Sequence, residues 1–222
     1  PPVHLSTQDT WEALKKLYPN VKPKIIGRIH MDEKYVKVGK VTHYDLNAID
    51  SKTKFVLAHL LVKRRTKKRV VEFLNQVKSS CYDQILAPYE IEKHKPAEKR
   101  KLVRFVCDGF ENYRNAFNKL FYRVASLTFG IPIKAKTEGL RYNNNAIERY
   151  NEEIEQRYKV MRNFKGAECA GSFLEMRRIV HNFVNPHMQL KGIIPAERAG
   201  INIALSQNKL LSLINHAYLT TS

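Results

Sequence analysis

The sequence has few cysteines, no long apolar run and no internal repeat. Its three cysteines, Cys81, Cys107 and Cys169, lie far apart without a CxxC pair, which argues against a disulfide framework and a cysteine-based zinc site. No apolar stretch approaches the roughly 20 residues that a membrane-spanning helix needs. No charged start followed by an apolar stretch indicates a secretory signal. We therefore expect a protein of the reducing, cytoplasmic interior.

Negative charge is also scarce. The 222 residues include 39 Lys and Arg but only 21 Asp and Glu, which gives a formal net charge of +18. An apolar content of 43% can form a sizeable core, so wholesale disorder is excluded and one domain is expected. The excess of positive charge favours a polyanionic partner, nucleic acid first and an anionic membrane surface second.

Strand patterns dominate the first third of the chain. Runs rich in β-branched and aromatic residues predict strands over 25–38, 41–50 and 55–62. A tight turn at Gly39 and Lys40 joins the first two, and the nearly continuous apolar character of the third suits a central strand. Together they predict an antiparallel meander.

Helical and strand patterns then alternate. The order β-β-β-α-β-α-β-α predicts an α/β, ribonuclease-H-like fold with a mixed five-stranded sheet flanked by helices. From residue 143 onward the pattern is helical. The intervening elements are predicted as a helix over 66–80, a charged loop over 83–101, a strand over 102–108, a helix over 112–121 and a strand over 122–129.

Three acids lie where such a fold brings side chains together. Asp32 is in the middle of the first strand, where an acid is costly unless it is paired or holds a metal. Asp108 ends the fourth strand, although a turn or cap role also suits it. Glu148 begins the long helix, where a solvated acid is equally ordinary. Glu152 and Glu155 share its face, so the spacing leaves open which of the three meets the two aspartates.

Glu148 lies at the edge of an apolar stripe on the long helix. That position lets its side chain reach the surface of the sheet without being buried outright. The stripe consists of Ile147, Tyr150, Ile154, Tyr158 and Met161.

Four blocks resemble the DDE transposases of prokaryotic insertion sequences, in the insertion-sequence-six-like group of the integrase and ribonuclease-H-like superfamily, and the resemblance favours an archaeal origin. They are HMDEKYVKVGKVTHYDLNAIDSKTKFVL, VCDGFENY, NNNAIERYNEEIEQRYKVMRNFKG and FVNPHMQLKGIIPAE, within a similarity over residues 3–200. The resemblance implies that Asp32, Asp108 and Glu148 are the catalytic and metal-binding triad. The short spacing between Asp108 and Glu148 leaves no room for an inserted domain.

The resemblance also implies a chemistry. Asp32 would bridge two Mg²⁺ ions, Asp108 would hold one and Glu148 the other, with Mn²⁺ as a substitute. Water would attack at the transposon end, and the freed 3′-hydroxyl would then attack target DNA. The implied partners are both DNAs and further copies of the chain, in a homodimer or larger synaptic complex. The implied location is the cytoplasm, at the nucleoid, without a membrane partner.

Basic residues near the acids are candidates for DNA contact, although a solvated loop or helix face is the simpler interpretation of each group. One group begins the run KRRTKKR over 63–69, and the other follows Glu148 on the long helix. Asn144 also matches the family, and we expect it to cap the helix or orient Glu148. The predicted DNA contacts are Lys63, Arg64, Arg65, Asn144, Arg157, Lys159 and Arg162.

Two departures from the family leave alternatives open. The family usually has Lys or Arg where this chain has Glu155, and residues 3–18 resemble only the last helix of its helix-turn-helix. We therefore divide the chain into a helix-turn-helix remnant with linker (1–22), a catalytic domain (23–200) and a helical tail (201–222). A decayed or co-opted transposase that only binds DNA is one alternative, and a nuclease acting on RNA–DNA hybrids is another.

Overall fold

The first three strands form the predicted antiparallel meander. A hairpin at Gly39, whose φ is +60°, joins the first two. The first strand starts later than residue 25, because the backbone N–H groups of Ile26 and Gly27 donate to the Asp50 carboxylate (3.2 and 2.8 Å) instead of to a neighbouring strand. The strands are β1 (Ile29–Val38), β2 (Val41–Asp50) and β3 (Val56–Val62). The computed structural model describes residues 21–130, 144–161, 163–203 and 206–219.

Two short strands complete a mixed sheet. The strands β4 (Arg104–Val106) and β5 (Ser126–Thr128) are shorter than predicted and run parallel to β1. The order across the sheet is β3-β2-β1-β4-β5. A three-stranded meander extended beside its first strand by parallel strands is the ribonuclease-H-like topology, which confirms the predicted fold class.

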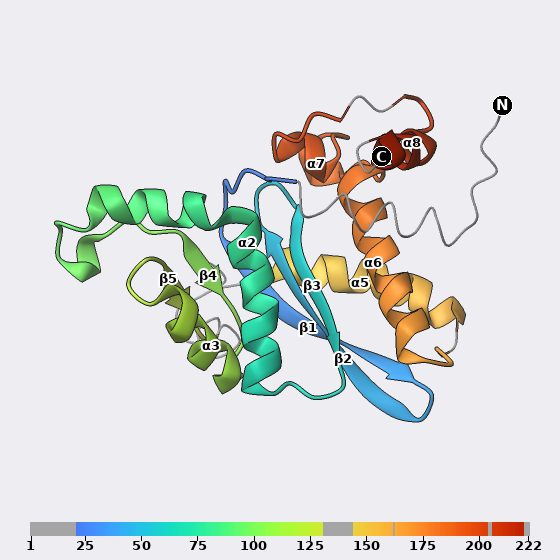
Figure 1. The fold of residues 1–222 in the computed structure, drawn as a ribbon, viewed down its shortest axis with the longest axis horizontal. Helices are drawn as coiled ribbons and strands as arrows, with labels where there is room; N and C mark the ends of the chain where they lie inside the picture. The colour runs from blue at the N-terminus through green and yellow to red at the C-terminus, as the bar shows by residue number, and fades with distance from the viewer. Residues whose placement is uncertain (1–20, 131–143, 162, 204–205, 220–222) are drawn as a thin grey trace.

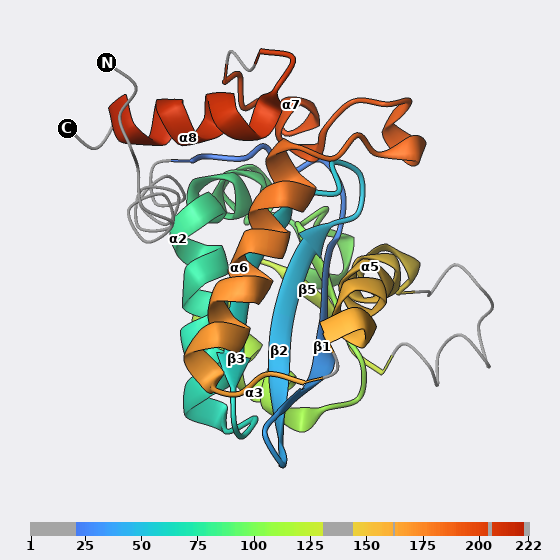
Figure 2. The same ribbon diagram turned by 90° about the vertical axis from the view of Figure 1, so that its right-hand side faces the viewer.

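Helices cover both faces of the sheet (Figures 1 and 2). One face carries α2 (Lys67–Glu92) and α3 (Glu111–Phe121), and the other carries α5 (Asn145–Met161) and α6 (Ala167–Phe183). Even-numbered residues of β1 face α5, because Val36 and Val38 pack with Ile147 and Ile154. The remaining elements are η2 (Ala97–Lys99), η3 (Met188–Leu190), α7 (Pro195–Arg198) and α8 (Lys209–Leu219).

Three residues of the stripe predicted on α5 are buried, and a fourth packs beside them. Ile147, Tyr150 and Ile154 are at most 2% exposed, and the ring of Tyr158 stacks on Phe164 with 5.6 Å between centroids. This stripe fixes which side of α5 meets the sheet and therefore holds Glu148 beside β1.

The predicted loop over 83–101 is wrong in its first half. The helix α2 bends at Cys81, which has non-helical angles (φ −151°, ψ 19°), and then continues through Pro88 to Glu92. Contacts distant in sequence hold this second half. The Gln84 amide donates to the carbonyl of Pro23 (2.7 Å) and accepts from the N–H of Ile25 (2.9 Å).

The predicted helix over 3–18 and Arg162 lie outside the described residues. Among the helices that are described, none has the length and apolar character required to cross a membrane.

Candidate active site

The polar edge of α5 lies along one face of β1. On that face, His30 Nδ1 lies 2.7 Å from Asn144 Oδ1, and the Asn151 amide donates a 3.0 Å hydrogen bond to Asp32 Oδ2. The seven-residue spacing of the two asparagines is two helical turns, which places both on one side of α5. Asp32 is therefore positioned by the strand and by the helix that covers it.

Asp108 reaches the same place from the neighbouring strand. The ladder between β4 and β1 ends where Val106 pairs with His30, so β4 stops two residues before it would reach Asp32. Asp108 follows at this open end, and its Oδ1 accepts the backbone N–H of Phe110 at 3.0 Å. The shortness of β4 thus leaves space in the sheet where two carboxylates meet.

A third carboxylate joins this pair, and sequence reasoning missed it. One oxygen each from Asp32, Glu33 and Asp108 lies within 4.8 Å of the others, a spacing that suits a metal ion. Glu33 is buried, forms an ion pair with Arg65 and accepts a 3.2 Å hydrogen bond from the hydroxyl of Tyr113. The pleat directs Glu33 towards α3 and Asp32 towards α5, but the end of β4 brings both near Asp108.

The Arg65 guanidinium is occupied within the protein. Besides its ion pair with Glu33, it lies over the rings of Tyr44 and Phe110, at 4.7 and 4.3 Å from their centroids. Its predicted neighbours in DNA contact, Lys63 and Arg64, are exposed. The side chains of the run over 63–69 therefore differ in their surroundings. Lys63 and Arg64 face solvent, whereas Arg65 compensates the buried charge of Glu33.

Burial and neighbouring charges raise the pKa of two of these acids, Asp32 and Glu33. Burial raises the pKa of Asp32 from 3.8 to about 7, and the charges of Glu33, Asp108 and Glu148 add to the effect. Burial and the charge of Asp108 also raise the pKa of Glu33, against the opposing influence of Arg65. A cation among the carboxylates would relieve this repulsion. Carboxylate oxygens are the hard ligands that Mg²⁺ prefers, so the donor set fits such an ion.

Glu148 lies beside this cluster rather than within it. Its side chain is exposed in the first turn of α5 and lies outside the group of three carboxylates. Its charge nevertheless contributes to the raised pKa of Asp32. Of the alternatives on the same helix, Glu152 is exposed, whereas Glu155 pairs with Lys34 and, at 3.8 Å, with Lys159.

The other predicted DNA contacts have different surroundings. Arg157 and Lys159 are exposed on the second half of α5. Asn144 is buried, with its side chain on His30, and its carbonyl accepts the backbone N–H of Glu148 at 3.2 Å. Asn144 therefore anchors the start of α5, and its backbone carbonyl fixes the position of Glu148 in the first turn.

Residues 27–187 match the family described as DDE domain. No curated protein matches the sequence. Three of the solved structures that resemble the chain come from retroviruses. A chain in the cryo-EM structure of the simian T-cell lymphotropic virus intasome in complex with PP2A regulatory subunit B56 gamma is 13% identical, with a TM-score of 0.48. The match covers 75% of this chain and 52% of that one, so the present chain spans about half its length.

Two catalytic core domains of integrases are also similar. The domain from BIV is 14% identical, with a TM-score of 0.44 and coverage of 77% of this chain and 91% of that one. The domain from HTLV-2, in complex with magnesium, is 10% identical, with a TM-score of 0.43 and coverage of 79% and 97%.

Proposed function

Because this chain belongs to the DDE domain family of transposases, we propose that it cuts DNA at a transposon end and joins the freed strand to target DNA in a metal-dependent reaction. The observation that carries this proposal is the meeting of Asp32 and Asp108 at the open end of β4, with Glu148 beside them on α5. The family match, over 27–187, includes all three positions.

The carboxylates of Asp32 and Asp108, with Glu148, would hold Mg²⁺, as two ions, and Mn²⁺ would substitute. When bound, such ions activate an oxygen nucleophile and stabilise the leaving oxygen of a phosphodiester. Glu33 is the closest additional acid, but its ion pair with Arg65 and its hydrogen bond from Tyr113 occupy it. We assign it the role of shaping the charge of the site.

Side chains around the acids position them. Asn151 holds one oxygen of Asp32 with its amide and leaves the rest of the carboxylate available. The N–H of Phe110 does the same for Asp108. Burial and the nearby acids raise the pKa of the Tyr113 hydroxyl well above 10, so that this group stays protonated and donates to Glu33. These contacts fix the carboxylates before substrate arrives, which lowers the cost of ordering them.

DNA is the partner that the family and the charge of +18 support. The exposed cations Lys63, Arg64, Arg157 and Lys159 would contact phosphates, together with Arg162, while Arg65 and Asn144 would act through the side chains that they hold. A homodimer or larger assembly would bring two transposon ends together. Because the proposed substrate is DNA, we expect the protein to act in the cytoplasm, at the nucleoid.

Strand transfer on DNA with preprocessed transposon ends tests this function. The parent protein should join ends to target DNA only when Mg²⁺ or Mn²⁺ is present, and Asp108→Asn should reduce the rate at least about 100-fold, the equivalent of ~3 kcal/mol. Asp83→Asn, which changes an exposed acid on α2, is the matched control and should keep the parent rate. An Asp108→Asn protein as active as the parent would contradict the proposal.

A further inference from the structure

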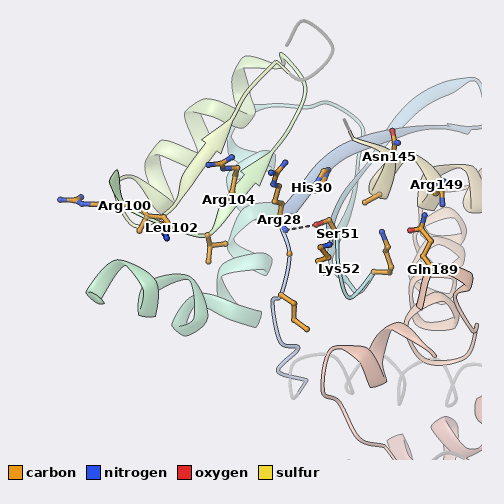
Figure 3. A pocket seen from close by; sticks show the side chains of 16 residues that line it. Arg28, His30, Ser51, Lys52, Arg100, Leu102, Arg104, Asn145, Arg149 and Gln189 are labelled. Atoms are coloured by element: carbon orange, nitrogen blue, oxygen red, sulfur yellow. Dashed lines mark hydrogen bonds between the residues drawn. The ribbon is translucent and has the colours of Figure 1, made fainter. Parts of the chain in front are cut away.

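A basic pocket of about 810 Å³ opens at the end of the sheet where β1 and β4 begin (Figure 3). Its walls come from five places: the chain leading into β1, the turn between β2 and β3, the segment that enters β4, the first turns of α5, and Gln189 of η3. None of the predicted DNA contacts lines it. The pocket is therefore a feature that the sequence motifs do not indicate.

The charge of this pocket has one sign. Seven of its sixteen lining residues are Lys or Arg, and none is Asp or Glu. Figure 3 shows arginines on both sides of it, with Arg104 on one and Arg149 on the other. The seven cations are Arg28, Lys52, Lys54, Arg100, Lys101, Arg104 and Arg149.

Asp50, a buried acid beside the pocket, is hydrogen-bonded to backbone N–H groups. Asp50 is fully buried, and its two oxygens accept four backbone N–H groups from the loops on either side of it, at 2.7 to 3.2 Å. Through these bonds it holds two of the pocket walls in place, and its charge offsets part of the positive charge. Burial, followed by the charge of Arg149, lowers the pKa of Lys54 against the opposing charge of Asp50, as expected where positive charges are crowded.

The pocket adjoins the catalytic acids. His30 lines it and shares its face of β1 with Asp32, two residues away, or ~7 Å at the rise of a strand. Asn145 and Ala146 of α5 also line it, a few residues before Glu148. Because each strand of DNA carries a phosphate per ~3.4 Å of helix axis, a strand with one phosphate at the acids would place another at the pocket.

The lining chemistry distinguishes a phosphate chain from a base. Aromatic rings that would stack on a base are missing, since no Phe, Tyr or Trp is among the sixteen lining residues. Lysine and arginine side chains that contact phosphates hold DNA in position without reading its sequence. The pocket is thus equipped for a sugar–phosphate backbone rather than for nucleotides recognised by their bases.

We propose that the basic pocket binds the sugar–phosphate backbone of the DNA strand that continues from the catalytic acids, and so sets the position of the phosphate to be cut or joined. This inference rests on the proposed function for the identity of the strand. The strand belongs either to the transposon end or to the target, and both present the same phosphodiester chemistry.

The pocket can be tested without catalysis by measuring the binding of a labelled DNA duplex of about 30 base pairs. Fluorescence anisotropy in the presence of EDTA gives the affinity. Lys52→Gln combined with Lys101→Gln removes one exposed cation from each of two walls. The control, Lys78→Gln with Lys119→Gln, removes the same charge from α2 and α3 on the opposite face of the sheet. Thermal melting checks that both double variants fold.

The pocket variant should bind the duplex at least about 10-fold more weakly at low salt. The slope of log K against log[salt] should fall by roughly one to two, since each lost phosphate contact contributes ~0.9. The control should lose less than about 3-fold. Equal losses in the two variants would overturn the proposal, because only net charge would then matter.

Strand-transfer kinetics then identify the strand. A higher KM of the pocket variant for preprocessed transposon ends assigns the pocket to that DNA, and a higher KM for target DNA assigns it to the target. An unchanged KM for both would overturn the positioning role. If the parent protein transfers no strand but its binding in EDTA depends on the pocket, the proposed function fails while the pocket remains a DNA site.

Discussion

The Asn151 amide holds the Asp32 carboxylate through a 3.0 Å hydrogen bond between α5 and β1. Asn151 is buried, so the bond is shielded from water, and it favours the charged form of Asp32. The helix therefore supplies both an acid, Glu148, and a side chain that prepares the acid of the neighbouring strand. Residues that orient metal ligands in this way typically contribute 10- to 100-fold to metal affinity or activity.

Asn151→Ala should weaken Mg²⁺ and Mn²⁺ binding by about 10-fold, because Asp32 loses the donor that fixes its orientation. Isothermal titration with Mn²⁺ measures the affinity. Asn163→Ala is the matched control, since Asn163 also donates its amide to an oxygen of the hairpin region, the carbonyl of Gly39 (2.9 Å), but is exposed. Equal affinities of the Asn151→Ala protein and the parent would show that the hydrogen bond has no positioning role.

Asp32→Asn should stabilise the metal-free protein at pH 8. Burial, reinforced by nearby acids, raises the pKa of Asp32 from 3.8 to about 7, so the folded chain binds this proton more tightly than the unfolded chain. The free energy of unfolding therefore falls as the pH rises from 3.8 to about 7 and stays low above it. The shift corresponds to roughly 4 kcal/mol; hydration of the partly exposed carboxylate reduces this, and we expect a gain of about 1–2 kcal/mol.

Urea unfolding in EDTA at pH 8 and pH 4 measures this gain. The difference between variant and parent should be much smaller at pH 4, where Asp32 is protonated in the folded chain and partly protonated in the unfolded chain. Mg²⁺ at pH 8 should then stabilise the parent more than the variant. A variant that is less stable than the parent at pH 8 in EDTA would contradict the raised pKa.

The sequence was sufficient to predict that Asp32 and Asp108 lie close together, but it did not predict Glu33 beside them. Strand periodicity places Asp32 in the sheet, and the chain order brings the end of the fourth strand beside it. The same period of two assigns Glu33 to the opposite face, away from Asp32. Only the length of β4, which ends at Val106, lets carboxylates from both faces meet, and three-residue strands leave a weak pattern in sequence.

Long-range contacts account for the other differences. The second half of α2 is held by Gln84, whose partners lie about 60 residues earlier in the sequence. Local sequence patterns do not contain these contacts, and they therefore predict a loop for the charged segment. The cations of the basic pocket are scattered from Arg28 to Arg149, and composition gives their charge but not their meeting place. The basic run over 63–69, in contrast, is obvious in the sequence, but the sequence does not show that Arg65 forms an ion pair with Glu33.

Arg65→Gln should destabilise the protein, because it leaves Glu33 buried without its cation. Breaking a buried pair costs ~3–5 kcal/mol, and the partial exposure of Arg65 reduces our expectation to about 1–2 kcal/mol. Arg64→Gln changes an exposed neighbour and should alter the free energy of unfolding by less than about 0.5 kcal/mol. Urea unfolding of both variants gives the comparison.

A second substitution identifies the cause of the loss. Adding Glu33→Gln to Arg65→Gln should restore part of the lost stability, since no buried charge is left unpaired. The hydroxyl of Tyr113 would still donate to the amide oxygen of the new Gln side chain. Losses that simply add in the double variant would show that Arg65 acts through packing on Tyr44 and Phe110 instead.

Glu155→Gln should strengthen DNA binding. Glu155 forms ion pairs with Lys34 on β1 and with Lys159 one helical turn later, and Lys34 first, then Lys159, lowers the pKa of its carboxyl. Glu155 is therefore charged at neutral pH and neutralises cations beside the proposed catalytic acids. Removing it frees up to two cations for phosphate contact. We expect about 3-fold tighter binding of a 30-base-pair duplex, with a salt slope steeper by up to ~2.

The matched control is Asp83→Asn, which removes an exposed acid from α2, away from the basic pocket, and changes the net charge equally. If net charge alone governs binding, both variants will gain the same affinity. A gain confined to Glu155→Gln, together with the steeper salt slope, places the DNA along the outer edge of α5. No gain from Glu155→Gln would mean that Lys34 and Lys159 do not face the DNA, and that the strand leaves the acids by another path.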